Sequence, residues 1–194
     1  MSLADGNPSY RRYATIVIDP PWRYTVNNPG APEKRCHSAE DHYLTLYQHE
    51  IAALPVAELA ARNAHLYMWV TNPVLTEQRL RGPSAVDIVR YWGFEPKTLL
   101  TWVKSEKGSG LGFYWRGDTE HVIFAVRGSL PIEPAHRISN VFRASRGRHS
   151  QKPEIFLDLV ETVSPPPRLE MFARRNRLGW DTWGNEALEH VEIA

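Results

Sequence analysis

Residues 14–22 read Ala-Thr-Ile-Val-Ile-Asp-Pro-Pro-Trp: five small or apolar residues, then an acid, two prolines and a tryptophan. The first five are typical of a buried strand. The prolines lack a backbone donor and restrict φ, so Asp19 to Trp22 should form a rigid turn at the carboxyl end of that strand. In open parallel sheets ligands bind at the carboxyl ends of the strands, so we expect a binding site to begin here.

Four more strand-like runs follow along the chain and alternate with helical stretches. Pro153 suits the first turn of the later helix, whose apolar residues Ile155, Phe156, Leu159 and Val163 are expected on one face. This order predicts an α/β fold with one open, mostly parallel sheet. The predicted strands are 14–19, 65–70, 98–103, 121–126 and 168–173, and the predicted helices are 74–92 and 153–163.

Composition indicates an ordinary globular protein: 194 residues, 42% hydrophobic and 23% charged, with a formal net charge of +1. We expect one domain over residues 1–194, with a flexible tail at 1–12. The near-neutral charge gives no general attraction to phosphate, so any nucleic-acid surface must be a local basic patch. Cys36 is the only cysteine. Without a disulfide or a run of signal-peptide or membrane-spanning length, a cytoplasmic location is expected.

The rigid turn brings two hydrogen-bond acceptors together, the Asp19 carboxylate and the Pro20 carbonyl. An exocyclic amine has two N–H donors, which this pair can satisfy. Such acceptors orient the amine and stabilise the positive charge that develops as it attacks a methyl sulfonium. Trp22 adds a flat surface on which a base can stack. The simpler alternative is a proline-rich turn that closes a strand and is covered by a packed tryptophan.

The tetrapeptide Asp19-Pro20-Pro21-Trp22 resembles the signature of the DPPW-type N6-adenine methyltransferases. These are relatives of the catalytic subunit of the messenger-RNA adenine methyltransferase and include small bacterial and phage enzymes. The resemblance covers residues 13–188 and implies a Rossmann-like class I methyltransferase with permuted motif order, in which the catalytic motif precedes the cofactor half. It continues through HYLTL at 42–46, LYMWVTNP at 66–73, YWGFEPKTLLTWVK at 91–104, EHVIFAVRG at 120–128, HSQKPE at 149–154 and LEMFARRNRLGWDTWGNE at 169–186.

The resemblance implies S-adenosyl-L-methionine as cofactor. Lys152 is expected to pair with the carboxylate of its methionine moiety, aided by the positive end of the helix that follows. Where related enzymes carry a glycine-rich cofactor loop, this chain has Ala173-Arg174-Arg175-Asn176. Glu186 is expected at the ribose hydroxyls. The implied cofactor-binding residues are Asp19, Lys152, Phe172, Arg174, Asn176, Asn185 and Glu186.

The resemblance also implies that Tyr43 sandwiches the target base opposite Trp22. Arg116 belongs to a segment in which cations and aromatic residues interleave, which suits a single strand or an extruded base. A plain surface loop explains that segment nearly as well. The basic stretch 137–149 can either follow phosphates or be a solvated loop.

Two other patterns do not lead to a site. Gly108-Ser109-Gly110-Leu111-Gly112 lacks the third glycine of a dinucleotide-binding fingerprint, because Phe113 occupies that position. Cys36, His37 and His42 lack the further ligands of a tetrahedral zinc site, so no metal is expected.

The predicted reaction is direct, in-line methyl transfer to N6 of adenine in a nucleic acid, with no covalent enzyme intermediate. The adenine should be single-stranded or flipped, because N6 is paired in a duplex. The catalytic residues are expected to be Asp19, Pro20, Pro21 and Trp22. DNA is favoured because the chain is compact, and RNA is the main alternative. A catalytically silent nucleic-acid-binding partner subunit is a further alternative, although the intact DPPW tetrapeptide argues against it.

Overall fold

The computed structural model describes residues 12–23, 45–76, 82–105, 115–147 and 151–184. Their strands form a single sheet with the order β5-β3-β4-β2-β1-β6-β7. The strands are β1 (Tyr13–Ile18), β2 (Ala60–Val70), β3 (Glu95–Lys104), β4 (Thr119–Arg127), β5 (Val141–Ala144), β6 (Arg168–Met171) and β7 (Trp180–Trp183). The helices are α1 (Gln48–Ala52), α2 (Val56–Leu59), α3 (Asn72–Thr76), α4 (Ala85–Tyr91) and α5 (Glu154–Val163), with a 3₁₀ turn, η2 (Pro134–His136).

The sheet is mostly parallel, which confirms the predicted fold class. β1 pairs in parallel with β2 and β6, β6 with β7, and β3 with β5. β4 alone runs antiparallel, between β2 and β3. The carboxyl ends of β1, β2, β3 and β6 therefore lie at one edge of the sheet, together with the amino end of β4, and chemically active residues that follow or begin these strands can meet there.

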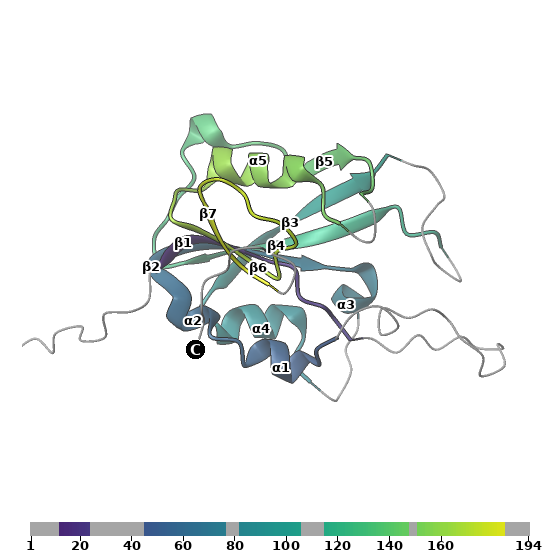
Figure 1. Cartoon of the computed structure of the whole chain (residues 1–194), viewed down its shortest axis with the longest axis horizontal. Helices are drawn as coiled ribbons and strands as arrows, with labels where there is room; N and C mark the ends of the chain where they lie inside the picture. The colour runs from purple at the N-terminus through teal and green to yellow at the C-terminus, as the bar shows by residue number, and fades with distance from the viewer. Residues whose placement is uncertain (1–11, 24–44, 77–81, 106–114, 148–150, 185–194) are drawn as a thin grey trace, which may run out of the picture.

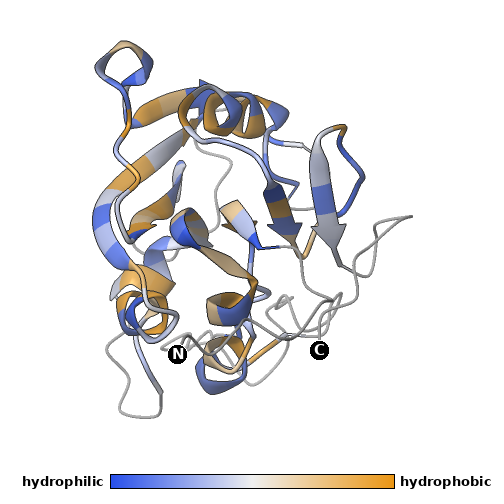
Figure 2. Ribbon diagram, turned by 90° about the vertical axis from the view of Figure 1, so that its left-hand side faces the viewer, coloured by the Kyte–Doolittle hydropathy of each residue, from blue (hydrophilic) through white to orange (hydrophobic). Residues whose placement is uncertain are grey.

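Helices cover both faces of the sheet, with α5 on one side and α1, α2 and α4 on the other (Figure 1). Alternation along β2 divides its side chains between two cores. Leu66 and Met68 pack with the α1 and α4 side, whereas Tyr67 and Trp69 pack with the α5 side. The helices carry apolar and hydrophilic residues in turn, as one-sided burial requires (Figure 2).

α5 begins after Pro153, which fills the N-cap position, and ends before the proline run at 165–167. The helix predicted over 153–163 is confirmed, but its buried face is rotated from the predicted one. Phe156, Leu157 and Val160 face the core, while Ile155 is 44% exposed. The Trp69 and Phe156 rings meet edge to face with centroids 4.7 Å apart, which fixes the helix at this rotation.

The five predicted strands are present, but other elements differ from the prediction, and α1 and α2 are among those not predicted. The helix expected over 74–92 is two short helices, α3 and α4. Residues 82–84 read Gly-Pro-Ser, and Ser84 caps α4 by accepting a hydrogen bond from the N–H of Asp87. β5 and β7 were not predicted, and β5 lies inside the basic stretch interpreted as a loop or phosphate track.

None of the helices in the described part of the chain is long and apolar enough to cross a membrane. Of the tail predicted at 1–12, only Arg12 falls within the described residues.

Candidate active site

The turn after β1 is held by backbone hydrogen bonds on both sides. The N–H of Asp19 donates to the carbonyl of Met171 in β6 (3.4 Å), and the N–H of Trp22 donates to the carbonyl of Pro20 (2.8 Å). Leu46 then pairs with this segment: its N–H donates to the carbonyl of Pro21 (2.8 Å), and its carbonyl accepts from the N–H of Arg23 (3.0 Å). The turn is therefore fixed by its sequence and by neighbouring chain, as a preorganised acceptor site requires.

Trp22 lies in the core and is only 6% exposed. Its indole N–H donates to the carbonyl of Trp69 at the end of β2 (2.9 Å). In this structure the buried ring anchors the turn to β2. Stacking of Trp22 on the target base stays a prediction.

Asp19 is the first member of a row of four alternating charges at this edge of the sheet. The Nζ of Lys152 lies 3.0 Å from Oδ2 of Asp19 and 3.4 Å from Oε2 of Glu120. The other carboxylate oxygen of Glu120, Oε1, accepts from Nζ of Lys104 at 2.7 Å. The row joins residues at the ends of β1, β3 and β4 to the segment before α5.

The four charges stabilise one another at a partly buried place, where their side chains are 11% to 26% exposed. Burial alone would lower the pKa of Lys152, but the charges of Asp19 and Glu120 outweigh it and raise that pKa. Burial alone would raise the pKa of Glu120, but Lys152 and Lys104 outweigh it and lower that pKa. Lys152 and Glu120 are therefore both ionised at neutral pH.

Glu170 in β6 lies close enough to Asp19 to be affected by its charge, but it is not a member of the row of ion pairs. Within the described part of the chain, its Oε2 is buried and has no hydrogen-bond partner. Burial raises the pKa of Glu170 to about 7, and the charge of Asp19 adds to this rise while Arg175 and Arg177 oppose it. A buried acceptor without a partner indicates a place where a ligand donor can bind.

The segment after β6 makes a close crossing with the end of β7. Phe172 has a φ of 61°, and its ring meets that of Trp183 with centroids 4.9 Å apart. The N–H of Ala173 donates to the carbonyl of Trp183 (3.1 Å). A Cβ added to Gly184 would lie 2.5 Å from the carbonyl oxygen of Ala173, so only glycine fits there.

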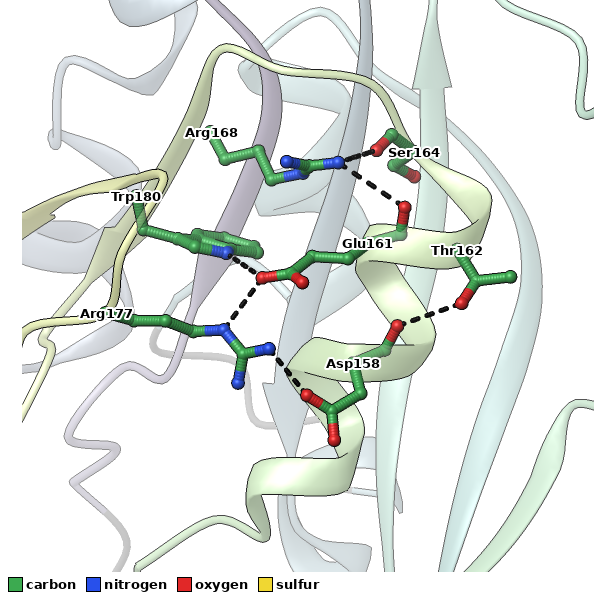
Figure 3. A network of polar contacts seen from close by, with 7 residues as sticks. All are labelled: Asp158, Glu161, Thr162, Ser164, Arg168, Arg177 and Trp180. Atoms are coloured by element: carbon green, nitrogen blue, oxygen red, sulfur yellow. Dashed lines mark hydrogen bonds and ion pairs between the residues drawn. The ribbon is translucent and has the colours of Figure 1, made fainter.

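A polar network fastens this segment to α5 (Figure 3). Glu161 accepts at Oε1 from Nε of Arg177 and from Nε1 of Trp180, both at 2.7 Å. Arg177 also donates to Oδ1 of Asp158 (2.5 Å). These contacts hold residues 174–176 near the start of α5, where Arg175 pairs with Glu154. Asn176 in turn donates to Oγ1 of Thr182 (3.2 Å).

Open space lies beside the row of charges. A cavity of about 370 Å³ is lined by residues 144–147 and 151–155 and by Arg175, so it includes Lys152. A second cavity of about 360 Å³ lies at the opposite edge of the sheet, between the end of α4 and the start of β3. We assign the site to the first because it adjoins Asp19 through Lys152.

The structure brings some predicted site residues together. Asp19 and Lys152 form an ion pair, and Phe172 directly follows Met171, whose carbonyl accepts from the N–H of Asp19. Arg174 and Asn176 belong to the segment held against α5. Arg116 is exposed in the segment before β4. Tyr43, Asn185 and Glu186 lie outside the described residues, as do the loop at 108–112 and Cys36, His37 and His42.

Sequence reasoning did not identify Glu120 or Glu170 as site residues. Each has a sequence signal: an acid in or beside an otherwise apolar strand that ends or begins at the productive edge of the sheet. Within the described residues no group of three or more histidine, cysteine or acidic side chains is arranged to hold a metal ion.

A family model described as MT-A70 matches residues 13–186. The type II methyltransferase M.MunI of a Mycoplasma species is 32% identical over 94% of the chain and 82% of its own length. The N6-methyladenosine RNA methyltransferase MTA1 of Cryphonectria parasitica is 31% identical over 90% of the chain. The human N(6)-adenine-specific methyltransferase METTL4 is 28% identical over 95% of it. The chain spans 51% of MTA1 and 40% of METTL4.

Proposed function

Because the chain belongs to the MT-A70 family, we propose that it transfers a methyl group from S-adenosylmethionine to the exocyclic N6 amine of adenine in a nucleic acid. The observation that carries this proposal is the position of Asp19: it follows β1 in a turn fixed by Pro20 and Pro21 and is paired with Lys152 at 3.0 Å. A fixed carboxylate at the carboxyl edge of the sheet is what the orientation of a weakly nucleophilic amine requires.

Asp19 and the Pro20 carbonyl receive the two N–H groups of the amine. A carboxylate has about four acceptor positions and a carbonyl has two. Asp19 can therefore accept from the amine while bound to Lys152, and Pro20 while bound to the N–H of Trp22. As the amine becomes positively charged, both acceptors stabilise that charge, and the Asp19 carboxylate is placed to take up the proton that the amine then loses.

When bound, S-adenosylmethionine supplies an electrophilic methyl group on a sulfonium. Two features of the chain support the binding of such a molecule: the buried Oε2 of Glu170 without a partner in the described residues, and the tight crossing at Gly184 that shapes the segment after β6. Lys152 has three N–H donors, and two carboxylates account for two of them. The third is assigned to the methionine carboxylate.

The remaining cofactor contacts are assigned by family resemblance. Phe172, Arg174 and Asn176 line the adenosine part, and Asn185 and Glu186 follow directly after Gly184, with Glu186 at the ribose hydroxyls. Tyr43 stacks on the target base, and Arg116 contacts the nucleic acid. Trp22 supports the turn from the core.

We assign DNA as the preferred substrate. The type II methyltransferase M.MunI is 32% identical over 94% of the chain, and this similarity supports DNA over RNA. A nucleic-acid substrate, together with a single cysteine, supports a cytoplasmic location. The intact DPPW turn and its ion pair argue against a silent partner subunit.

The test is methyl transfer from labelled S-adenosylmethionine to matched DNA and RNA oligonucleotides, each single-stranded and duplex, followed by digestion to nucleosides. The proposal predicts label in N6-methyldeoxyadenosine, with the fastest transfer to single-stranded DNA because unpairing and unstacking cost a few kcal/mol. Label confined to RNA would overturn the DNA assignment, and label in cytosine would overturn the activity.

A further inference from the structure

Lys152 is held by Glu120 as well as by Asp19, and Glu120 is held in turn by Lys104. Resting on the proposed function, we propose that Glu120 and Lys104 are positioning residues, which fix the ammonium of Lys152 against the catalytic carboxylate of Asp19 during methyl transfer. Neither residue needs to touch the substrate for this role.

The topology gives Lys104 and Glu120 a fixed mutual position. Both belong to the antiparallel pair β3–β4, in which Trp102 is opposite Glu120 and the N–H of Lys104 donates to the carbonyl of Asp118 (2.8 Å). Their side chains are 11% and 18% exposed, so little water competes for the 2.7 Å contact between them. Glu120 therefore reaches Lys152 from a hydrogen-bonded pair of strands.

Asp19, by contrast, belongs to β1, and β2 lies between β1 and β4 in the sheet. Lys152 spans this gap. Its Nζ lies 5.2 Å from the centroid of the Trp69 ring of β2, with Glu120 on one side and Asp19 on the other. A lysine side chain has four rotatable carbon links, and one carboxylate alone would leave the ammonium several positions. The second carboxylate, Glu120, selects one.

The charges of the row cancel: Lys104 and Lys152 are cations, and Glu120 and Asp19 are anions. Glu170, whose pKa is raised in part by the charge of Asp19, belongs to β6 and lies outside the row. If Lys104 were lost, Glu120 would compete with Asp19 for Lys152. If Glu120 were lost, Lys104 would keep a partly buried charge without its ion-pair partner, and Lys152 would lose its second contact. The position of the Lys152 ammonium and the charge around Asp19 therefore depend on two residues of the β3–β4 pair.

The test compares Glu120→Gln, Lys104→Met and the double variant with the parent protein. The matched controls are Glu95→Gln and Lys97→Met, the same changes at exposed positions of β3. The measurements are kcat and KM for an adenine oligonucleotide, the dependence of kcat on pH, the Kd of S-adenosylhomocysteine by calorimetry, and Tm.

We expect Glu120→Gln to lower kcat by about 10- to 100-fold, by analogy with the loss seen when the hydrogen-bond partners that orient metal-binding side chains are removed. KM for the oligonucleotide should stay near the parental value. The acid side of the kcat profile should move to higher pH in Lys104→Met, where negative charge is in excess, and to lower pH in Glu120→Gln. The double variant leaves one cation, Lys152, and one anion, Asp19, so its pH profile of kcat should return toward that of the parent. Its kcat should stay low because Glu120 no longer holds the ammonium of Lys152.

A purely structural role would lower Tm and leave kcat and its pH profile unchanged in the folded variants, and that result would overturn the proposal. If Glu120→Gln does not fold, the double variant still decides, because a parental kcat there would exclude positioning by this pair. Failure of the proposed function itself is distinguishable: the parent protein would then transfer no methyl group, whereas calorimetry would still report the affinity for S-adenosylhomocysteine.

Discussion

The ammonium of Lys152 lies 3.0 Å from the carboxylate of Asp19, although the two residues come from segments far apart in the sequence. One precedes α5 and the other follows β1. This contact connects the DPPW turn, which carries the proposed amine acceptors, with the half of the chain assigned to the cofactor.

Replacing Lys152 with methionine should weaken both chemistry and cofactor binding. The change leaves Asp19 and Glu120 as neighbouring carboxylates. Loss of one member of a buried ion pair costs about 3–5 kcal/mol, and less is expected here because the Lys152 and Asp19 side chains are 20% and 26% exposed. We expect a lower Tm, a lower kcat and a weaker Kd for S-adenosylhomocysteine in calorimetry. Lys97→Met is the matched control on the protein surface. Parental affinity in folded Lys152→Met would remove Lys152 from the cofactor site.

Replacing Trp22 with phenylalanine separates anchoring from stacking. Phenylalanine keeps an aromatic face but cannot donate to the carbonyl of Trp69, which would then be a buried acceptor without its partner. Such a loss costs about 1–3 kcal/mol. We expect a lower free energy of unfolding in urea and a lower kcat, because the DPPW turn loses its tie to β2. Unchanged stability with a raised KM for the oligonucleotide would instead support stacking on the base.

Glu170 should make the stability of the protein depend on pH. Folding raises the pKa of Glu170 from its ordinary 4.5 to about 7, so the folded state binds the proton more tightly than the unfolded state. This contribution is complete below pH 4.5 and is lost as the pH rises through 7. At 1.4 kcal/mol per pKa unit the shift corresponds to roughly 3 kcal/mol.

The variant Glu170→Gln cannot ionise and should remove this dependence. Its Tm relative to the parent should therefore rise between pH 5 and pH 8, measured by calorimetry without ligand. Glu95→Gln, at an exposed position, should follow the parent over the same range. A constant difference in Tm between the Glu170 variant and the parent would show that Glu170 is ionised throughout this range.

Replacing Gly184 with alanine should disturb the crossing after β6. The new Cβ would approach the carbonyl oxygen of Ala173 to 2.5 Å, closer than van der Waals contact permits, and both groups belong to backbone that cannot rotate away. We expect a lower Tm and loss of S-adenosylhomocysteine binding. At Gly82 a Cβ would meet only the flexible Gln48 side chain, so Gly82→Ala is the control. Normal binding by Gly184→Ala would place the cofactor away from this crossing.

Sequence periodicity was sufficient for the central strands and α5. β1 is a continuous apolar run because both of its faces are covered, and that pattern is visible without a structure. β5 and β7 were missed because each has four residues and no adjoining apolar run, whereas β6, equally short, continues in the sequence into Phe172 and Ala173. The prediction of one helix over 74–92 was wrong. The apolar spacing continues across Gly82 and Pro83, but residues 82–84 are not helical and α4 begins only at Ala85.

The site was partly predictable for a related reason. Asp19 and Lys152 belong to local sequence motifs, and the structure brings them into contact. Glu120 acts through Lys104 and Lys152, which come from other elements, so its role appears only after folding. The burial of Trp22 depends likewise on what covers the ring, and a local motif does not contain that information.

The central claim is that the Asp19 carboxylate holds the amine that receives the methyl group. The direct test is the single-turnover rate of methyl transfer to a single-stranded adenine oligonucleotide, at saturating S-adenosylmethionine and oligonucleotide, for the parent and for Asp19→Asn. Asparagine keeps the shape of the side chain but loses its charge and presents a donor to the amine. The predicted result is a loss of about 10²- to 10³-fold in rate with a folded protein, as judged by Tm. A rate near that of the parent in folded Asp19→Asn would contradict the account.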